Sequence, residues 1–580
     1  MIVPMKKIYV VVQKKDIVPA LETLRGLGSI HVEHQEPLTG FQLEERRGEV
    51  EILENAIAVL QAVKVKGEIG QIEAADWTET VNTVLGLSAQ AERYKESVAK
   101  RQVLINRWEP WGHFDLQAVR EMAERGIYVQ LCAVPRDQRK AAPRGVALET
   151  VYSSGGMDRC VAISREPVDL PFEKIALPEK SLKEMTDLQR EEQSKIGRAE
   201  ENIEAQLCYL NSLQKILVER RNVLSFEEVE RGMREDEVLA VLKGYCPADA
   251  CKATAKKAKE ERWGILFEDP SEGDQVPTLL KNPAWIEMIK PIFGMINIVP
   301  GYKEFDISFL FLMFFSIFVG ILIGDAGYAV VYALFFRFAL PRFIPKKPEQ
   351  KTFYALMYLL CGCTFIWGVL TGTYFGQQWL PSYVRPLVPW LRDNYNIQVL
   401  CFMIGAVHLS LAHLWRALAK LPSVSFLADV GWLVVIWGMY GWARSLVLGD
   451  PAPGFLLLMV GSAMVVLFTR PNINPLKAVG PGLGNLLLNV INSFTDIVSY
   501  IRLFAVGLAT VAVADAANSM SLFWIFFLHT LNILLAAMAI LVHGLRLNVL
   551  EFSGHLSMEW AGFQYSPFKK INETQPYGTK

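Results

Sequence analysis

Six polar side chains follow one another along a long apolar stretch, residues 485–518. Their spacings are four, three, four, three and three residues, which places them on one face of an α-helix. They are Asn485, Asn489, Asn492, Asp496, Ser499 and Arg502. The same face continues with small residues only, namely Ala505, Ala509, Ala512 and Ala516. At about 1.5 Å per residue, the stretch is longer than a bilayer requires.

Arg502 lies where the polar half of this face meets the small half. A guanidinium stays protonated in proteins, so it remains charged inside a membrane, at a cost of roughly 2.5–3.5 kcal/mol on insertion scales. A snorkelling arginine or a structural ion pair is the simpler interpretation. Because Arg502 is deep in the apolar run with polar neighbours on one side, we favour a place on an ion path.

A second arginine occurs in the next apolar stretch, residues 522–550. His543 and Arg546 are three residues apart and therefore neighbours on one helix face, and Glu551 follows directly. Two arginines on consecutive apolar stretches are hard to explain as lipid-facing residues. The pair strengthens the prediction of an ion path.

The segments SYIRLFAVGLA (499–509) and HGLRLNVLEF (543–552) resemble the two arginine-bearing helices of subunit a, or subunit I, of rotary V-type and archaeal A-type ATPases. The resemblance implies that these helices face a ring of proteolipid subunits and separate two aqueous half-channels. Arg502 and Arg546 would then carry out ion translocation. The half-channel candidates are Asn485, Asn489, Asn492, Asp496, Ser499, His543, Glu551 and Asp325.

Asp325 enters that list through GDAGY (324–328), which is similar to a hairpin turn of the family. The resemblance implies that Asp325 lines the outer half-channel, and a capped turn aspartate is the alternative. The sequence also departs from the family. Ala536 stands where some relatives carry a glutamate, and Thr510 stands where many carry a histidine. The usual Ser-Lys-Phe after Glu551 is replaced by residues 553–556, SGHL.

The composition divides the chain. Residues 1–285 hold most of the charge, 286–305 form a linker, 306–568 are mostly apolar, and 569–580 form a tail. A net charge of −1 gives no argument for nucleic-acid binding. The eight cysteines are scattered and form no metal-ligand pattern, so we expect reduced thiols and no metal. No signal peptide is evident at the N-terminus.

The charged half predicts α+β lobes joined by a long antiparallel coiled-coil arm. Strand-like runs occupy 6–13, 128–134, 147–153 and 159–165. Residues 181–230 form one long charged helix, with apolar residues a heptad apart at Ile196, Ile203, Leu210 and Leu217. A phosphate-binding loop of the GxxxxGK[ST] type is missing, so we expect no nucleotide site and no cofactor.

The apolar half predicts eight membrane spans, the last two long. They lie near 307–324, 327–340, 353–374, 397–415, 429–447, 454–469, 484–517 and 521–555. Basic residues follow the even-numbered spans: Arg342, Lys346, Lys347, Lys351, Arg416, Lys420, Arg470 and Lys477. The opposite loops carry Arg385, Arg392 and Arg444. This bias puts both termini in the cytoplasm. In span four, His408 and His413 are either relays or hydrogen-bonded core histidines.

These observations predict the multi-pass stator subunit of a prokaryotic V/A-type ATPase, non-catalytic itself, in the cell membrane. The resemblance implies a proteolipid c/K-type ring, peripheral stalk E/G-type subunits and a central stalk d/C-type subunit as partners. A free-standing secondary transporter is the alternative; it predicts inverted repeats with broken helices, and no clear internal repeat is found. A membrane-anchored scaffold would leave the two arginines unexplained.

Overall fold

The computed structural model describes residues 1–63, 70, 72–136, 143, 145–343, 350–379, 381, 386–451, 454–469 and 475–571. Of residues 475–482 and 485 only the backbone is described. Several residues used above therefore lie outside the described part: Lys346, Lys347, Arg385, Arg470, residues 572–580, and the side chains of Lys477 and Asn485. The chain forms two compact units, one of Met1–Glu33 and Glu235–Lys569, the other mainly of His34–Arg234.

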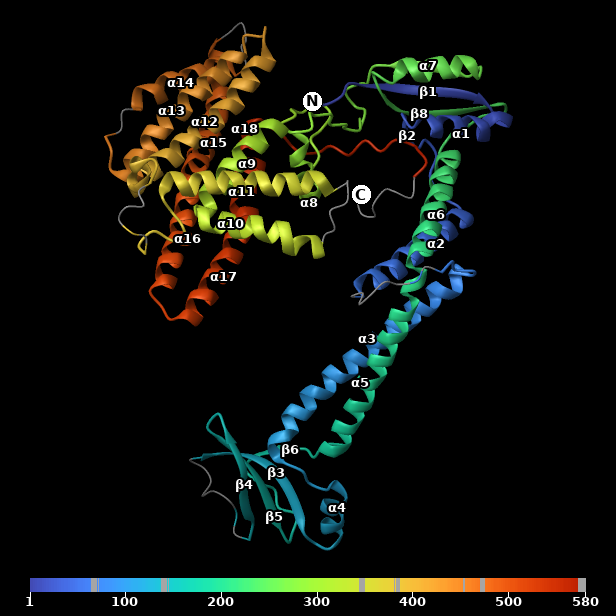
Figure 1. Cartoon of the computed structure of the whole chain (residues 1–580), viewed down its shortest axis with the longest axis vertical. Helices are drawn as coiled ribbons and strands as arrows, with labels where there is room; N and C mark the ends of the chain where they lie inside the picture. Colours follow the sequence, from blue (N-terminus) through green and yellow to red (C-terminus); the bar gives the residue numbers. More distant parts are fainter. Residues whose placement is uncertain are drawn as a thin grey trace. The chain divides into compact units, whose positions relative to one another are not determined.

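The second unit contains two pairs of antiparallel helices. The four helices are α2 (Phe41–Ala62), α3 (Trp77–Trp108), α5 (Leu182–Ala205) and α6 (Leu210–Arg231). Ion pairs between Arg47 and Glu228 and between Glu54 and Arg221 set α2 against α6 in opposite directions. Figure 1 shows α3 and α5 side by side in the same way, tied by a hydrogen bond from Gln189 to Gln102.

Helices α5 and α6 together occupy the stretch expected as one long helix. A capping box of Ser181 and Glu184 begins it, because the two residues satisfy each other's backbone amides. A short 3₁₀ segment, Gln206–Tyr209, interrupts the α-helical hydrogen bonding. Of the predicted heptad positions, Ile203 and Leu217 are buried and Ile196 and Leu210 are half-buried. The coiled-coil arm as a mechanical element stays a prediction.

At one end of α3 and α5 lies a four-stranded sheet in the order β4-β5-β3-β6. Its strands are β3 (Tyr128–Pro135), β4 (Ala147–Ser154), β5 (Met157–Ser164) and β6 (Glu173–Ile175), beside helix α4 (Leu116–Glu124). Trp108, Trp111 and Leu131 are buried where the end of α3 meets the sheet. The three longer strands lie where the sequence predicts them.

The first unit contains the other sheet and the apolar helices. The sheet has the path β2-β8-β1-β9, and its elements are β1 (Met5–Gln13), β2 (His31–Glu33), β8 (Leu239–Pro247), β9 (Gly264–Glu268), α1 (Ile17–Leu27) and α7 (Cys251–Glu260). Gly28, at φ 56°, ends α1 in the left-handed conformation that glycine adopts without strain. Thr278 and Tyr565 pair through their backbones, so the C-terminal segment is tied to residues beside the sheet.

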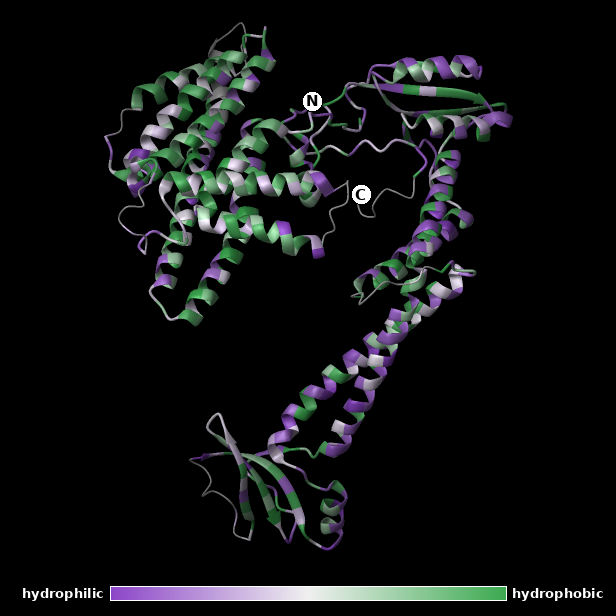
Figure 2. Ribbon diagram, viewed as in Figure 1, coloured by the Kyte–Doolittle hydropathy of each residue, from purple (hydrophilic) through white to green (hydrophobic). Residues whose placement is uncertain are grey.

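All eight predicted spans are helical where described. The helices are α8 (Lys290–Ile296), α9 (Ser308–Ile323), α10 (Ala326–Leu334), α11 (Lys351–Thr371), α12 (Asn394–Lys420), α13 (Phe426–Leu448), α14 (Phe455–Phe468), α15 (Pro475–Ser499), α16 (Ile501–Asn518), α17 (Leu522–Ala539) and α18 (Ser553–His555). Within the described residues, five helical stretches are long and apolar enough to cross a membrane, or six if the bent pair α9–α10 counts as one. A count of eight spans stays a prediction. The bundle is the strongly hydrophobic part of the ribbon in Figure 2.

Helices α9 and α10 meet at a sharp bend of 111°. Gly324, at φ 67°, ends α9, and Asp325 begins α10 by accepting hydrogen bonds from the amides of Gly327 and Tyr328. A Cβ on Gly368 of α11 would lie 2.1 Å from the backbone nitrogen of Ala326, so glycine is required where α11 crosses the bend. Helix α9 is buried except along one stripe formed by Phe309, Met313 and Ile317.

The buried leucines of α6 allow a test of the helix pairing. Leu217→Ala removes a fully buried side chain and should destabilise the α2–α6 pair by about 2–5 kcal/mol. Faster amide hydrogen exchange in residues 41–62 and 210–231 is the expected result. The matched control is Glu219→Ala, an exposed position on the same helix, and equal exchange in both variants would contradict the pairing.

Candidate functional site

The two arginines singled out from the sequence converge on one buried carboxylate. Arg546 Nε lies 3.3 Å from Glu551 Oε1, and Arg502 Nη1 lies 3.9 Å from the same oxygen. The Glu551 side chain is 3% exposed, against 22% for Arg502 and 54% for Arg546. The site thus has two cations around one anion, and one of the cations faces outward.

Local helix geometry brings Arg546 and Glu551 together. Residues Ile540–Gly544 and Leu547–Phe552 are π-helical, with hydrogen bonds that link residues five apart. A regular α-helix would place positions 546 and 551 on different faces, whereas the wider π turn stacks them. Such turns are frequent at functional sites.

Two atoms of this cluster keep unused hydrogen-bonding capacity. Within the described part of the chain, Arg502 Nη1 and Glu551 Oε2 are buried and make no hydrogen bond. A buried group of this kind is costly unless it finds a partner. Among the described residues, the cluster therefore keeps one N–H group and one carboxylate oxygen without a hydrogen bond.

The polar face of the first arginine helix is interrupted but largely uncovered. A turn at Tyr500 separates α15 from α16, so Asp496 and Arg502 lie on either side of a break. Asn489 and Asn492 are exposed, and so are all four alanines of the small face, Ala505, Ala509, Ala512 and Ala516. Ser499 donates to the carbonyl of Thr495 at 2.9 Å, within its own helix. His543 is partly buried in the first π turn.

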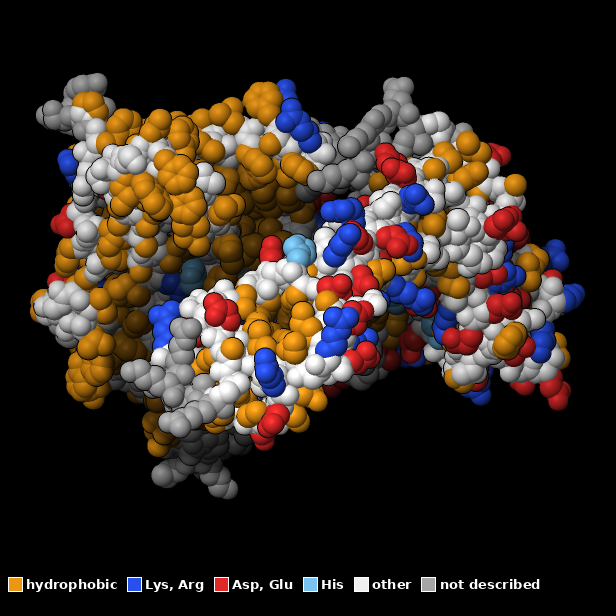
Figure 3. Space-filling model, turned by 90° about the horizontal axis from the view of Figure 1, so that it is seen from below, with side chains coloured by type: hydrophobic (Ala, Val, Ile, Leu, Met, Phe, Trp, Pro, Cys, Tyr) orange, Lys and Arg blue, Asp and Glu red, His pale blue; other side chains and the backbone are white. Residues whose placement is uncertain are grey.

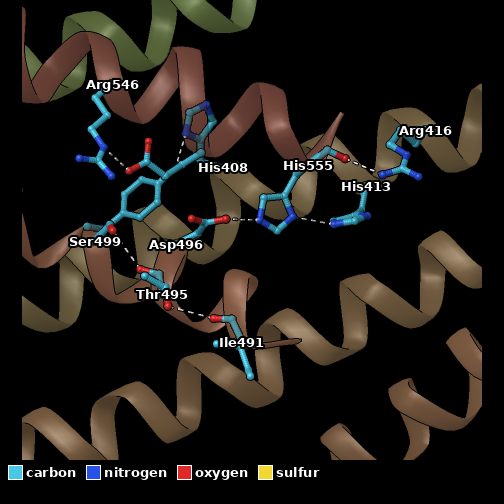
Figure 4. A network of polar contacts seen from close by, with 11 residues as sticks. His408, His413, Arg416, Ile491, Thr495, Asp496, Ser499, Arg546 and His555 are labelled. Atoms are coloured by element: carbon cyan, nitrogen blue, oxygen red, sulfur yellow. Dashed lines mark hydrogen bonds and ion pairs between the residues drawn. The ribbon is translucent and has the colours of Figure 1, made fainter. Parts of the chain in front are cut away.

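Asp496 starts a chain of contacts that runs away from the arginines (Figure 4). Its Oδ2 lies 3.1 Å from His555 Nε2, and His555 Nδ1 lies 2.9 Å from His413 Nε2. His413 Nδ1 in turn lies 3.5 Å from Oδ1 of Asp429, which also binds Arg416 and Lys420. We call Asp496, His555, His413 and Asp429 the histidine chain.

Sequence reasoning found only part of the histidine chain. It names Asp496 as a candidate and His413 as one of two possibilities, but gives His555 and Asp429 no role. His555 was visible as the departure from Ser-Lys-Phe, and that substitution was the available signal. Asp429 gave none, since an aspartate in the first turn of a helix is ordinary.

The other histidine of span four has the environment of a core residue. His408 is fully buried, stacks between Phe314 and Phe552 at ring-centroid distances of 3.9 and 4.2 Å, and shares a hydrogen bond of 2.8 Å with Tyr500. The surroundings of His408 and His413 thus differ: His408 packs against aromatic rings, with its Nε2 making no hydrogen bond within the described residues, and His413 contacts titratable partners.

Asp325 is not part of either cluster. It is 1% exposed and accepts four backbone hydrogen bonds, from Gly327, Tyr328, Phe375 and Gly376, at 2.7–3.1 Å. These contacts are those of a helix cap that also fixes the loop after α11. The capping alternative therefore accounts for all its contacts in the described residues, and a half-channel role stays a prediction.

The cap can be tested by Asp325→Asn. Both carboxylate oxygens of Asp325 accept hydrogen bonds, whereas the asparagine side chain has one acceptor oxygen and would turn its NH₂ group toward a backbone N–H. The variant should therefore lose about 1–3 kcal/mol of stability. Thermal unfolding of the detergent-solubilised protein measures this loss. Asp393→Asn is the control, because Asp393 caps α12 through the amide of Tyr395 alone and asparagine caps equally well. Equal melting of the two variants would remove the structural role of Asp325.

Among the described residues, no group of three or more His, Cys, Asp or Glu side chains is arranged to hold a metal ion. The candidate site is therefore made of charged side chains and hydrogen bonds. Two chemical abilities follow: attraction of an anionic group to the arginine pair, and exchange of protons along the histidine chain.

Comparison with known proteins points to one family of complexes. No family model matches the chain. The chain is 28% identical to V-type ATP synthase subunit I of Borreliella burgdorferi, with 99% of this chain and 100% of that protein covered. V-type ATP synthase subunit I 1 of Treponema pallidum is also 28% identical, over 98% of this chain and 100% of its own length. A-type ATP synthase subunit I of Pyrococcus horikoshii is 24% identical over 71% of this chain and 64% of its own. The resemblance stated from the two arginine segments is thereby confirmed across nearly the whole sequence.

Proposed function

We propose that this chain is the membrane stator subunit of a prokaryotic V/A-type rotary ATPase. It would move H⁺ or Na⁺ across the cell membrane through two half-channels formed against a proteolipid ring. The chain's similarity to V-type and A-type ATP synthase subunit I supports this role. The observation that carries the proposal is the convergence of Arg502 and Arg546 on the buried Glu551.

The arginine cluster has the charge needed to hold a passing carboxylate briefly. Two guanidiniums and one carboxylate leave a net charge of +1, so a ring carboxylate would stay ionised beside them. A tight buried ion pair would stall rotation. Glu551 prevents this by competing for the same donors, and it also positions both arginines. The more exposed Arg546 and the free donor of Arg502 could hand the carboxylate on.

The helices that carry the arginines are open on one side. Only 11% of the most apolar window of Leu522–His555 is buried within the chain. The alanine face of α16 is exposed, and small residues let another helix approach closely. Figure 3 shows hydrophobic side chains spread over the surface of the helix bundle. A ring of apolar helices on one side and lipid on the other would cover this surface.

The soluble elements suit attachment to other subunits. We assign the paired helices α2–α6 and α3–α5 to a coiled-coil arm that binds peripheral stalk E/G-type subunits and a central stalk d/C-type subunit. The excess of basic residues after the even-numbered spans, among them Arg342 and Lys420, supports a cytoplasmic location for both termini. ATP hydrolysis would take place on other subunits.

Arg502 is the residue whose loss should be most severe. Arg502→Ala and Arg502→Lys should both assemble and both lose ATP-driven ion transport. Alanine removes the charge, and the compact ammonium of lysine lacks the planar fork of donors that arginine offers. Arg546→Ala should be milder. The measurement is ATP-driven acidification or Na⁺ uptake in vesicles, normalised to assembled complex. Arg444→Ala is the control, since Arg444 pairs with Asp450 near a loop and should pump normally. Near wild-type pumping by Arg502→Ala would refute the proposed mechanism.

Purification in mild detergent tests the assembly itself. The stator role requires that the chain co-migrates with a proteolipid ring and ATPase subunits. Migration alone, with ion transport retained after reconstitution of the isolated chain, would instead identify a free-standing transporter.

A further inference from the structure

We propose that the histidine chain is a proton wire. The ion that this protein moves is therefore H⁺ and not Na⁺. The inference rests on the proposed function and names the ion that the same site moves. It is carried by three consecutive contacts between titratable groups, of 3.1, 2.9 and 3.5 Å. These contacts join α15 to α18, α12 and α13.

Most of the histidine chain is buried, so protons cannot pass around it through bulk water. His413, His555 and Asp429 are 3%, 8% and 1% exposed, and Asp496 is more open, on the polar face of α15. At 2.9 Å, the two imidazole nitrogens are in direct hydrogen-bond contact, which leaves no space for a cation between them. A sodium ion needs a cage of oxygen ligands, whereas a proton passes along a hydrogen bond.

The hydrogen bonds permit transfer in either direction. With both rings neutral and protonated on Nε2, His555 donates to Asp496 and His413 donates to His555, while His413 Nδ1 faces Asp429 without a proton. That nitrogen makes no hydrogen bond within the described residues, as this arrangement requires. Here the tautomers are assigned from the contact pattern.

One proton entering at His413 Nδ1 then displaces one proton at each later step. His413 passes its Nε2 proton to His555 Nδ1, and His555 passes its Nε2 proton to the Asp496 carboxylate, which becomes neutral. One proton enters and one leaves, so both rings end neutral with inverted tautomers. The reverse transfer, or rotation of the rings, restores the starting state.

The fixed charges around the chain favour a single mobile proton. Asp429 contacts Arg416 Nε at 3.3 Å and Lys420 Nζ at 2.5 Å, and Arg416 also donates to the carbonyl of His555 at 2.8 Å. Two cations and two carboxylates sum to zero, so an added proton raises the cluster to +1 only. Lys420 is partly exposed at the end of α12, next to the α12–α13 loop. Asp429 there faces His413 Nδ1 and contacts Lys420, whose side chain is partly exposed.

A purely structural role for these contacts is the competing explanation, since they tie four helices together. The two roles differ in chemistry. A structural tie needs only hydrogen bonds, which glutamine can supply, whereas a wire needs a group that takes up and releases a proton near neutral pH.

The test uses the assembled complex in vesicles with His413→Gln, His555→Gln and His555→Ala, each normalised to assembled complex. ATP-driven acidification should fall by about tenfold or more in all three, as expected for loss of a proton-transfer group. Added imidazole should restore much of the rate in His555→Ala, because it can occupy the vacated space and shuttle protons. Pyrazole, which has a similar size but is a far weaker base, should not.

His529→Gln is the matched control. His529 lies in the same unit, bonds to Tyr328 and Asn518, and contacts no member of the histidine chain, so its acidification should be unchanged. Wild-type acidification by both glutamine variants would overturn the wire, and so would equal rescue by pyrazole. Na⁺ uptake that persists in these variants would overturn the assignment of the ion. The Arg502→Ala variant separates this inference from the proposed function. If the wire is overturned but Arg502→Ala still abolishes ATP-driven ion transport, the proposed function stands. If Arg502→Ala transports ions normally, the proposed function itself is refuted.

Discussion

A guanidinium in a membrane cannot lose its charge, and the last part of this chain is built around that constraint. Arg502 and Arg546 would each carry a large desolvation cost alone. Glu551 offsets part of it for both, at the expense of burying a carboxylate to 3% exposure. Because two cations surround one anion, the cluster keeps a net positive charge. It remains able to attract one more carboxylate.

Position 551 depends on an irregular helix. The π turns at Ile540–Gly544 and Leu547–Phe552 depart from regular α-helical hydrogen bonding. They place Glu551 on the same helix face as Arg546, with its Oε1 3.9 Å from Arg502 Nη1. Close packing supports the same region. Gly507 of α16 approaches the carbonyl of Ile321 so closely that a Cβ would lie 2.6 Å away. Helix α9 thus packs directly against α16 at this point.

The polar groups of the bundle fall into separate sets with different physical roles. Asp325 is saturated by four backbone amides, and His408 is stacked between two rings, so both hold the fold together. Unused donors or acceptors remain in the arginine cluster and in the histidine chain, and also at Nε2 of His408. Buried polar groups without a hydrogen bond are uncommon in proteins, so an unused donor or acceptor alone does not separate a functional site from a packed core position.

The sequence by itself determined the helical apolar half, the α+β elements, the arginine positions and the polar stripe, because periodicity and composition act within one segment. Tertiary structure alone decided which groups meet. Asp496 lies 59 residues from His555, and His413 lies 142 residues from it, so no local pattern could join them. The 111° bend, in contrast, lies at the GDAGY turn that the sequence singles out, and the structure adds the close packing of Gly368 of α11 against Ala326. Local spacing fixes which face a residue occupies, while the folded bundle fixes what that face touches.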